Sequence, residues 1–376
     1  MDEERYMRRA IELARLGEGW TNPNPMVGAV IVKDGRIIGE GYHRKCGELH
    51  AERNALSSLT ESAVGAAVYV TLEPCCHYGK TPPCTEAIIE SGISKVVIGS
   101  QDPNPLVSGR GAGILREAGI EVVQGFLKEE CDALNPIFFH YITNKTPYVI
   151  MKYAMTMDGK IATKTGASKW ITGAEALEKV HALRHKCMGI MAGICTVLAD
   201  DPMLNCRSRE ISKRRDPVRI ICDSHLRIPL ESNLVKTAGD QETFVIFAEK
   251  AALSGAILDK MKALHEAGIT CVNLPDESGK VDMRALMTFL GDKGIDSVLL
   301  EGGGTLNESA LRAGIVQEIY AFVAPKIFGG TAPGPVMGEG VELPKDAMTF
   351  ELAEMQKMGQ DAFLRFVKRS GVEAEL

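Results

Sequence analysis

Residues 67–89 read AVYVTLEPCCHYGKTPPCTEAII, an apolar segment followed by a cysteine-rich loop and a second apolar segment. The first segment, 67–74, is short and rich in β-prone residues, and it predicts a buried strand. The second, 85–92, predicts a short helix that ends at a glycine. Between the strand and the helix lie three cysteines, Cys75, Cys76 and Cys84.

The sequence on either side continues this alternation. Residues 48–58 predict a helix, and 95–100 and 121–126 predict strands with a helical stretch between them. Upstream, two β-prone runs, 27–32 and 37–41, flank an Asp-Gly pair, which is typical of a β-hairpin. Strands alternating with helices indicate a layered α/β domain.

The pattern starts again after a polar break near residue 144, and we place the boundary between two domains, 1–145 and 146–376, at this point. The clearest helices of the second half are predicted over 251–268 and 281–294. Strands are predicted at seven apolar runs: 148–154, 188–193, 218–222, 243–247, 269–273, 297–300 and 318–323. The second domain is therefore also predicted to be α/β.

Composition narrows the class of protein. Of 376 residues, 45% are hydrophobic and 24% are charged, as in soluble globular proteins. The net charge of −6 argues against a broad nucleic-acid footprint. No apolar run approaches the ~18 residues of a membrane helix, and the N-terminus has no signal-peptide pattern. We expect a cytoplasmic protein with neither a nucleic-acid nor a membrane partner, in which clustered cysteines indicate metal binding or catalysis.

The cysteine cluster follows His50-Ala51-Glu52, and together they match the H-x-E…P-C-x-x-C signature of zinc deaminases with a longer interval between the cysteines. One imidazole and two thiolates supply three zinc ligands and leave the fourth position open, as in catalytic sites. We predict His50, Cys75 and Cys84 as ligands of one zinc ion. Glu52 is predicted to transfer the proton.

Other arrangements of the ligands are compatible with the sequence. Cys76 or His77 could replace one of the cysteines, or His43 could join His50 and two cysteines in a structural site. A structural site would leave Glu52 unexplained, so we favour catalysis. The loop between Cys75 and Cys84 is then expected to contact substrate.

The second half has no G-x-G-x-x-G fingerprint after a strand. It has instead a predicted strand that ends at Glu301, three glycines, and a helix predicted to start near Leu306. Glycines at a helix N-terminus allow backbone N–H groups to approach phosphates, although such a turn is as often a simple connection.

Several motifs resemble those of the bifunctional deaminase–reductases of riboflavin biosynthesis. These are TNPNPMVGAVIV (21–32), GYHRKCGELHAE (41–52), TLEPCCHYGKTPPCTEAII (71–89), MKYAMTMDGKIAT (151–163), SKWITG (168–173), MAGICTVLADDPMLNCR (191–207) and EGGGTLN (301–307). They cover nearly the whole chain in the expected order.

The resemblance implies a cytidine-deaminase-like three-layer α/β/α domain followed by a dihydrofolate-reductase-like α/β domain. It implies hydrolytic deamination of 2,5-diamino-6-(5-phosphoribosylamino)pyrimidin-4-one, followed by reduction of the ribosyl chain to ribityl with NADPH. The expected partners are this phosphorylated small molecule, one zinc ion per chain, NADPH, and further copies of the chain in a homo-oligomer.

The resemblance also assigns residues. The pyrimidine pocket of the deaminase is expected to include Asn24, His43, His77 and Lys80. NADPH is expected at Ala154, Trp170, Thr196, Asp200, Ser224, Gly302, Gly303, Gly304, Thr305, Leu306 and Asn307. The ribosyl phosphate is expected at Ser168, Arg184, Leu204, Arg207 and Glu301, with Lys152 as a further cation for the sugar. The two arginines suit a phosphate by charge and fork geometry.

Two other functions share some of these features. A nucleic-acid base deaminase with an accessory domain would use the same zinc chemistry on a flipped base. A non-catalytic binding protein would keep the metal for stability and carry a degenerate reductase half.

Overall fold

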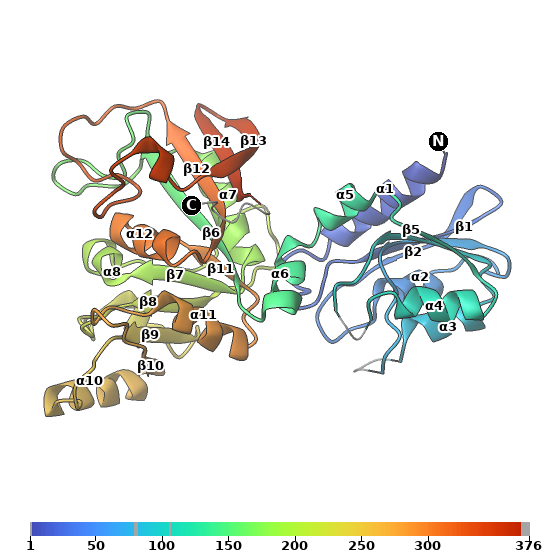
Figure 1. Ribbon diagram of the computed structural model, residues 1–376, viewed down its shortest axis with the longest axis horizontal. Helices are drawn as coiled ribbons and strands as arrows, with labels where there is room; N and C mark the ends of the chain where they lie inside the picture. The colour runs from blue at the N-terminus through green and yellow to red at the C-terminus, as the bar shows by residue number, and fades with distance from the viewer. Residues whose placement is uncertain (1, 79–81, 105–106, 370–376) are drawn as a thin grey trace. The chain divides into compact units, whose positions relative to one another are not determined.

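The computed structural model describes residues 2–78, 82–104 and 107–369, which belong to two units, unit 1 (1–145) and unit 2 (146–376) (Figure 1). Each unit is built on its own β-sheet. No helix within the described residues is both long and apolar enough to cross a membrane.

The hairpin predicted from the Asp-Gly pair is confirmed. Strands β1 (Gly28–Lys33) and β2 (Arg36–Tyr42) pair antiparallel, joined by Asp34 and Gly35. Both turn residues have positive φ, 48° and 73°, as a type I′ turn requires.

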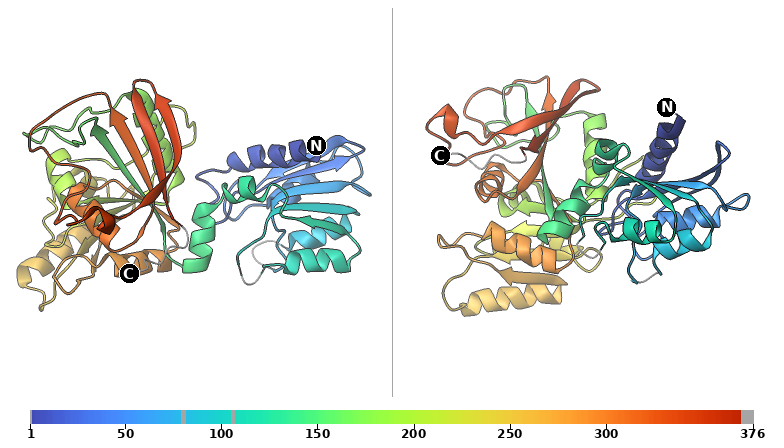
Figure 2. Two further views of the ribbon diagram at one scale, coloured as in Figure 1. Left: turned by 45° about the horizontal axis from the view of Figure 1, so that its top comes forward. Right: turned by 45° about the vertical axis from the view of Figure 1, so that its right-hand side comes forward.

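Unit 1 has a five-stranded sheet between two layers of helices (Figure 2). The remaining strands are β3 (Ala67–Leu72), β4 (Lys95–Ser100) and β5 (Glu121–Gln124), in the order β2-β1-β3-β4-β5, with β3, β4 and β5 parallel. One face packs on α1 (Asp2–Arg15) and the segment of α5 (Lys128–Asp132). The other packs on α2 (Ala51–Ser57), α3 (Cys84–Glu90) and α4 (Arg110–Glu117). The predicted α/β layering is confirmed.

A helix that we did not predict, α6 (Pro136–Asn144), closes unit 1. Just before it, the buried Asn135 accepts a hydrogen bond from Met26 N at 2.8 Å and donates one to Met26 O at 2.9 Å. This amide pair fixes the start of α6 against the loop that carries Asn24.

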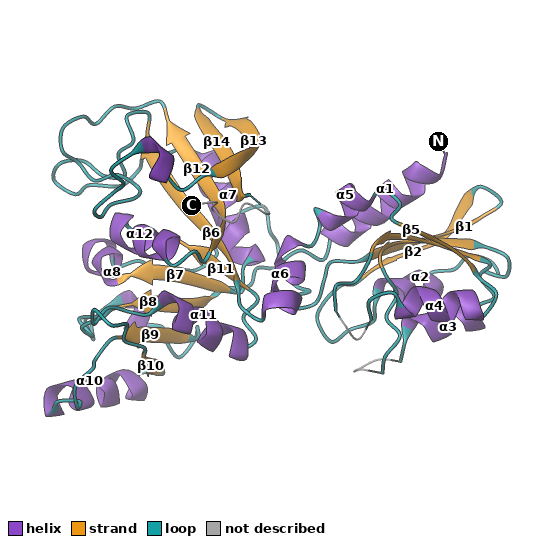
Figure 3. Cartoon of the chain, in the orientation of Figure 1, coloured by secondary structure: helices purple, strands orange, loops and turns teal. Residues whose placement is uncertain are grey.

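Unit 2 is organised around a nine-stranded sheet with helices on both faces (Figure 3). Its strands are β6 (Tyr148–Thr156), β7 (Gly189–Gly193), β8 (Val218–Cys222), β9 (Thr243–Phe247), β10 (Ile269–Asn273), β11 (Ser297–Leu300), β12 (Val316–Ala324), β13 (Phe350–Met358) and β14 (Asp361–Lys368). The order is β10-β9-β8-β7-β11-β6-β12-β14-β13, and all pairs are parallel except those of β14. The seven predicted strands are confirmed, whereas β13 and β14 were not predicted.

The helices of unit 2 are α7 (Ala174–Lys186), α8 (Ile194–Asp200), α9 (Asn233–Lys236), α10 (Gly255–Glu266), α11 (Met283–Asp292) and α12 (Gly304–Arg312), with a short 3₁₀ turn at Pro344–Asp346. Residues of α8, α9 and α10 share one apolar core with the sheet, and residues of α11 and α12 share another. Neighbouring residues Ile190 and Met191 of β7 lie in different cores, so this strand is buried on both faces.

Candidate functional site

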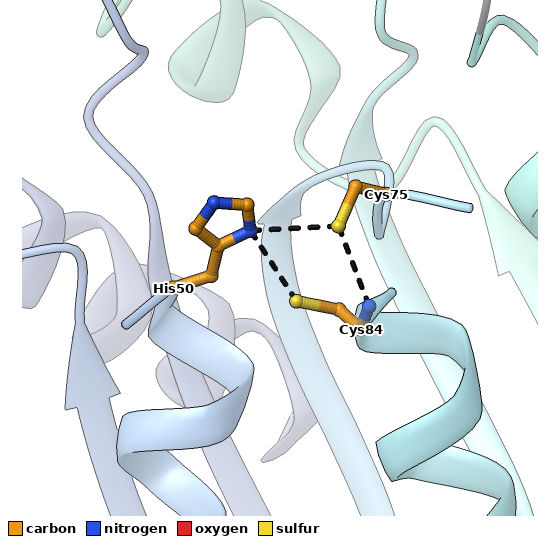
Figure 4. Close-up of side chains that lie close together, drawn as sticks. All are labelled: His50, Cys75 and Cys84. Atoms are coloured by element: carbon orange, nitrogen blue, oxygen red, sulfur yellow. Dashed lines mark hydrogen bonds between the residues drawn. The ribbon is translucent and has the colours of Figure 1, made fainter. Parts of the chain in front are cut away.

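Three side chains of unit 1 converge at the carboxyl end of β3 (Figure 4). His50 precedes α2, Cys75 follows β3, and Cys84 is the first residue of α3. The Nδ1 atom of His50 lies 3.4 Å from the Sγ atoms of both cysteines, and the ligand atoms all lie within 4.8 Å of one another. With Zn–N of about 2.1 Å and Zn–S of about 2.3 Å, tetrahedral nitrogen and sulfur ligands lie about 3.6 Å apart, so these residues fit zinc.

The alternative ligands do not join this group. Among the described residues, His50, Cys75 and Cys84 form the one cluster of three potential metal-binding side chains. His43 instead hydrogen-bonds through Nδ1 to Leu49 O at 3.1 Å and meets Asn24 Nδ2 through Nε2 at 3.2 Å.

The second residue of α2, Glu52, is the candidate for proton transfer. Glu52 lies in the first turn of α2 with only 4% of its surface exposed, and burial raises the pKa of its carboxyl group. Its neighbours in the same cavity include His50 and Cys75. A carboxyl group with a raised pKa beside a metal site is suited to accepting and returning a proton.

The cavity at this site has a volume of about 570 Å³. Of the pocket residues expected from the sequence, Asn24, His43 and His77 line it, whereas Lys80 lies outside the described residues. His43 donates its Nδ1 proton to a carbonyl, so its Nε2 is the acceptor for the Asn24 amide. Burial lowers the pKa of His43, in agreement with a neutral ring.

Sequence reasoning missed several residues that line this cavity: Cys46, Glu73, Asp102, Asn104, Phe138, Tyr141 and Ile142. A signal for two of them was present, because Asp102 and Asn104 directly follow β4, and parallel strands end at the same edge of a sheet. The three residues of α6 carried no such signal.

Glu73 has a structural role at the edge of the cavity. Its carboxylate accepts hydrogen bonds from Gly109 N at 3.0 Å and Ala112 N at 3.1 Å, at the start of α4. Two residues later the chain reaches Cys75. The bonds therefore fix the backbone that presents this ligand.

Unit 2 has a buried ion cluster at the carboxyl end of β11, next to the middle of β6. Glu301 accepts hydrogen bonds from Arg184 Nε at 2.6 Å and Arg184 Nη2 at 3.0 Å, and its carboxylate lies 3.0 Å from Lys152 Nζ. The Glu301 side chain is only 10% exposed. The two cations overcome the effect of burial and hold the pKa of Glu301 well below its usual range.

The third nitrogen of Arg184, Nη1, donates to Asn205 O at 3.0 Å. All three nitrogens of this guanidinium are thus used within the protein. Arg207, two residues beyond Asn205, is exposed instead.

The glycine-rich turn lies beside this cluster, and α12 begins at Gly304, two residues earlier than predicted. A Cβ atom on Gly304 would lie 2.4 Å from Met337 Cγ and 2.9 Å from Gly334 O. The turn therefore packs tightly against the segment 334–337. Thr196 lies next to Gly303, 4.0 Å from the position of its absent Cβ.

The other residues expected at the cofactor occupy the same edge of the sheet or the loops that follow it. Ala154 lies near the end of β6, Thr196 and Asp200 lie in α8, which follows β7, and Ser224 follows β8. Trp170 is exposed, and Ser168 Oγ lies 3.5 Å from Asp200 Oδ1.

Asn307 and Leu204 are placed differently from the others because both are buried. Asn307 has no exposed surface, and its Nδ2 donates to Pro335 O at 2.8 Å. Its side chain thus supports the segment that packs on the glycine turn.

Comparisons with known proteins agree with this two-part organisation. The family of the RibD C-terminal domain matches residues 147–364, and the cytidine and deoxycytidylate deaminase zinc-binding region matches residues 1–100. The riboflavin biosynthesis protein RibD of Actinobacillus pleuropneumoniae is 53% identical over 96% of this chain and 94% of its own length. RibD of Escherichia coli is 40% identical over 98% of this chain and its full length.

Solved structures give the same result. RibD of Acinetobacter baumannii aligns with a TM-score of 0.87 and 36% identity, covering 98% of this chain and 99% of that one. A diaminohydroxyphosphoribosylaminopyrimidine deaminase/5-amino-6-(5-phosphoribosylamino)uracil reductase from Thermotoga maritima aligns with a TM-score of 0.83 and 38% identity, covering 98% of this chain and 99% of that one. The N-terminal fold is cytidine-deaminase-like, and the C-terminal fold is that of the dihydrofolate-reductase-like RibD domain, as expected.

The Glu301 cluster predicts a specific dependence of stability on pH. Replacing Glu301 by Gln leaves two buried cations without their counter-charge and is expected to lower the free energy of unfolding of unit 2 by about 3 kcal/mol at pH 7. Because the pKa of Glu301 is lower in the folded chain than in the unfolded chain, its stabilisation is complete above about pH 4.5. It declines by about 1.4 kcal/mol per pH unit below that value. The difference between wild type and variant should therefore shrink at pH 3.5.

Urea unfolding followed by the fluorescence of Trp170, with Trp20 replaced by Phe in every protein, measures this difference. The exposed Glu342→Gln serves as the matched control and should show no such pH-dependent difference. An equal effect of Glu301→Gln at both pH values would contradict the assigned charge state.

Proposed function

The chain belongs to the RibD family of riboflavin biosynthesis, and from this membership we propose which of its residues carry out the two reactions. It is a bifunctional enzyme, a deaminase and a reductase, that uses zinc and NADPH and acts on a small molecule. Unit 1 is assigned to the deamination and unit 2 to the reduction. Family membership favours the bifunctional enzyme over the nucleic-acid deaminase and the non-catalytic binding protein.

The deaminase assignment rests on one observation, the convergence of three ligand atoms within 4.8 Å beside a buried carboxyl group. His50, Cys75 and Cys84 would hold the zinc ion. When bound there, zinc supplies the Lewis acidity that makes water a nucleophile at neutral pH. The substrate is the diaminopyrimidinone of a ribosylamino 5′-phosphate.

Glu52 moves the protons of this reaction. Its carboxylate takes a proton from the attacking water and passes it to the ring nitrogen of the pyrimidine. The carboxylate then takes the remaining proton from the hydroxyl group on the ring carbon and gives it to the amine, which leaves as ammonia while the ring carbon keeps the oxygen. Asn24, His43 and His77 orient the ring in the cavity, with Lys80 assigned to the same pocket from the resemblance alone.

The reductase assignment rests on the Lys152–Glu301–Arg184 cluster at the carboxyl edge of the sheet of unit 2. When bound, NADPH supplies the hydride that opens the ribose to a ribityl chain. Lys152 and Glu301 bind the hydroxyl groups of the sugar at this edge, with Ser168 and Leu204 in the adjoining segments. Arg207 binds the 5′-phosphate. Because all three nitrogens of Arg184 are engaged, we assign this residue to fixing Glu301 and not to the phosphate.

The cofactor is assigned to the edge formed by the ends of β6, β7, β8 and β11, with Ala154, Trp170, Thr196, Asp200 and Ser224 around it. The backbone of the turn from Gly302 to Leu306 receives the phosphates, because N–H groups at the start of α12 favour anions. Asn307 is assigned to this turn as well, and its side chain supports the turn through Pro335. None of the ten cysteines, all of which lie in the described residues, forms a disulfide bond, and we propose a reducing, cytoplasmic location.

The zinc assignment predicts a difference between neighbouring cysteines. Cys84→Ser removes a thiolate ligand and should lower the zinc content of the purified chain from one ion to well below one. Cys76→Ser is the matched control, because Cys76 lies outside the ligand cluster, and it should retain about one ion. Metal analysis by mass spectrometry gives both values, and equal zinc contents would refute the ligand set.

The assignment of Glu52 is tested by Glu52→Gln, which keeps the size of the side chain but cannot carry the proton. Deamination should fall roughly 10²- to 10⁴-fold. Zinc content should stay at one ion per chain, and the reductase activity on the deaminated substrate should be unchanged. Ammonia release measures the first activity and NADPH oxidation the second. Turnover within tenfold of wild type would remove Glu52 from this role.

We also propose that the chain forms a homo-oligomer through unit 2. The edge strand β13 is exposed along nearly its whole length and carries the apolar side chains Leu352 and Met355, both exposed. The outer edge of an edge strand has unpaired backbone groups, and together with apolar side chains it favours pairing with another chain.

Light scattering of the full chain should give a mass above that of one chain, and Leu352→Lys should lower this mass. A monomer at all concentrations up to about 100 µM would contradict the proposal.

A further inference from the structure

The segment between α8 and β8, residues 201–217, carries Arg207 on an irregular backbone. It belongs to neither a helix nor a strand. An irregular backbone that is not held by other groups loses conformational entropy when a ligand binds, and this weakens binding. A ligand-binding residue on such a segment is therefore held in place only if other groups bind the backbone around it.

Helix α7 supplies those groups from one face. Glu178, His181 and His185 follow one another at spacings of three and four residues, which place side chains on the same side of a helix. Glu178 accepts hydrogen bonds from the Ser208 hydroxyl and from Arg209 N at 3.1 Å. These bonds attach the middle of the segment, at Ser208 and Arg209, to α7.

The two histidines make matching contacts. His181 Nδ1 accepts a hydrogen bond from Arg207 N at 3.1 Å, and His185 Nδ1 accepts one from Arg215 N at 3.1 Å. The backbone oxygen of His181 also accepts a hydrogen bond from the Cys206 thiol at 3.2 Å. The side chain of Cys206 and the backbone N–H of Arg207 are thus both bound to His181.

The contact with Arg207 fixes the protonation state of His181. A backbone N–H can only donate, so Nδ1 must be unprotonated and the proton must lie on Nε2. His181 is 5% exposed, and burial together with the charges of Arg184 and Arg207 lowers its pKa to about 4, against the opposite effect of Glu301 and Glu178. The ring therefore remains an acceptor at neutral pH.

The side chain of Arg207 is available for a ligand. It is exposed, and its guanidinium makes no hydrogen bond or ion pair with any described residue. Two residues earlier, Asn205 is bound to Arg184, which is bound to Glu301. The backbone around Arg207 is thus bound at Asn205 by Arg184 of the ion cluster and at Arg207 N by His181.

We propose that His181 is a positioning residue of the reductase half: its Nδ1 fixes the backbone of Arg207 and so holds the guanidinium at the 5′-phosphate of the substrate. The inference rests on the assignment of Arg207 in the proposed function. Because the phosphate does not react, loss of this contact weakens substrate binding and leaves the hydride step nearly unchanged.

Two variants of matched polarity test the proposal in the full chain. In His181→Asn the carboxamide oxygen can take the place of Nδ1, whereas in His181→Gln the carboxamide extends to the position of Nε2 and leaves Arg207 N without its acceptor. The KM for 5-amino-6-(5-phosphoribosylamino)uracil, supplied directly, should rise about tenfold in His181→Gln and less than threefold in His181→Asn. The kcat values should stay within about twofold. Equal KM values for the two variants, or a lower kcat at unchanged KM, would overturn the proposal.

His185→Gln is the control for general loosening of the segment, because it removes the same kind of bond eight residues from Arg207. Its KM should stay within about twofold of wild type, and the dissociation constant for NADPH should be unchanged in all variants. A KM increase in His185→Gln equal to that in His181→Gln would assign the effect to the whole segment and overturn the specific role of His181.

Arg207→Ala separates this inference from the proposed function. It should raise the KM at least as much as His181→Gln, and adding His181→Gln to Arg207→Ala should change the KM less than twofold, because both act through one guanidinium. If Arg207→Ala raises the KM and His181→Gln does not, the role of His181 fails and the phosphate assignment stands. If Arg207→Ala leaves the KM unchanged, both fail.

Discussion

The candidate zinc site of unit 1 depends on bringing one imidazole nitrogen and two sulfur atoms to within 4.8 Å of one another from separate parts of the chain. Three ends of elements meet to do this: the N-terminus of α2, the carboxyl end of β3 and the N-terminus of α3. The hydrogen bonds of Glu73 to α4 then fix the backbone between β3 and Cys75. The same arrangement places the Glu52 carboxyl group beside the metal ligands in a buried position, where its affinity for a proton is increased.

Unit 2 uses charge in a comparable way. Burying the Glu301 carboxylate, which is 10% exposed, would raise the free energy of the folded chain if it had no partner. Lys152 and Arg184 compensate for its charge beyond the carboxyl end of β11. Arg184 also extends this cluster into the irregular segment that carries Arg207. The groups that we propose to bind the substrate of the reductase are therefore connected through hydrogen bonds to the sheet.

Much of this organisation was predictable because it follows from short-range rules. The Asp34-Gly35 turn has the positive φ values that its sequence favours, and inner strands of the unit 2 sheet such as β9 and β11 are short apolar runs because both of their faces are buried. The clustering of His50, Cys75 and Cys84 was expected from the spacing and types of these residues.

Other features depend on distant contacts that a sequence pattern does not contain. Strand β13 was missed because its side chains are mostly exposed and its sequence, FELAEMQKM, has no buried face. The engagement of Arg184 with Glu301 joins residues 117 positions apart. Asn307 was expected at the cofactor from its place in the glycine-rich motif, yet it is buried because the segment 334–337 covers it.

Helix α6 shows that the active cavity of unit 1 extends beyond the region that carries its chemistry. The zinc-binding region shared with other deaminases matches residues 1–100, but Phe138 and Tyr141 form part of the cavity wall, and Asn135 ties this helix to Met26. The zinc-binding region is thus shorter than the stretch of chain that encloses its cavity. Grafting or exchange of this deaminase between proteins has to carry the chain through Asn144, since a shorter transplant would keep the three proposed zinc ligands and lose part of the cavity wall.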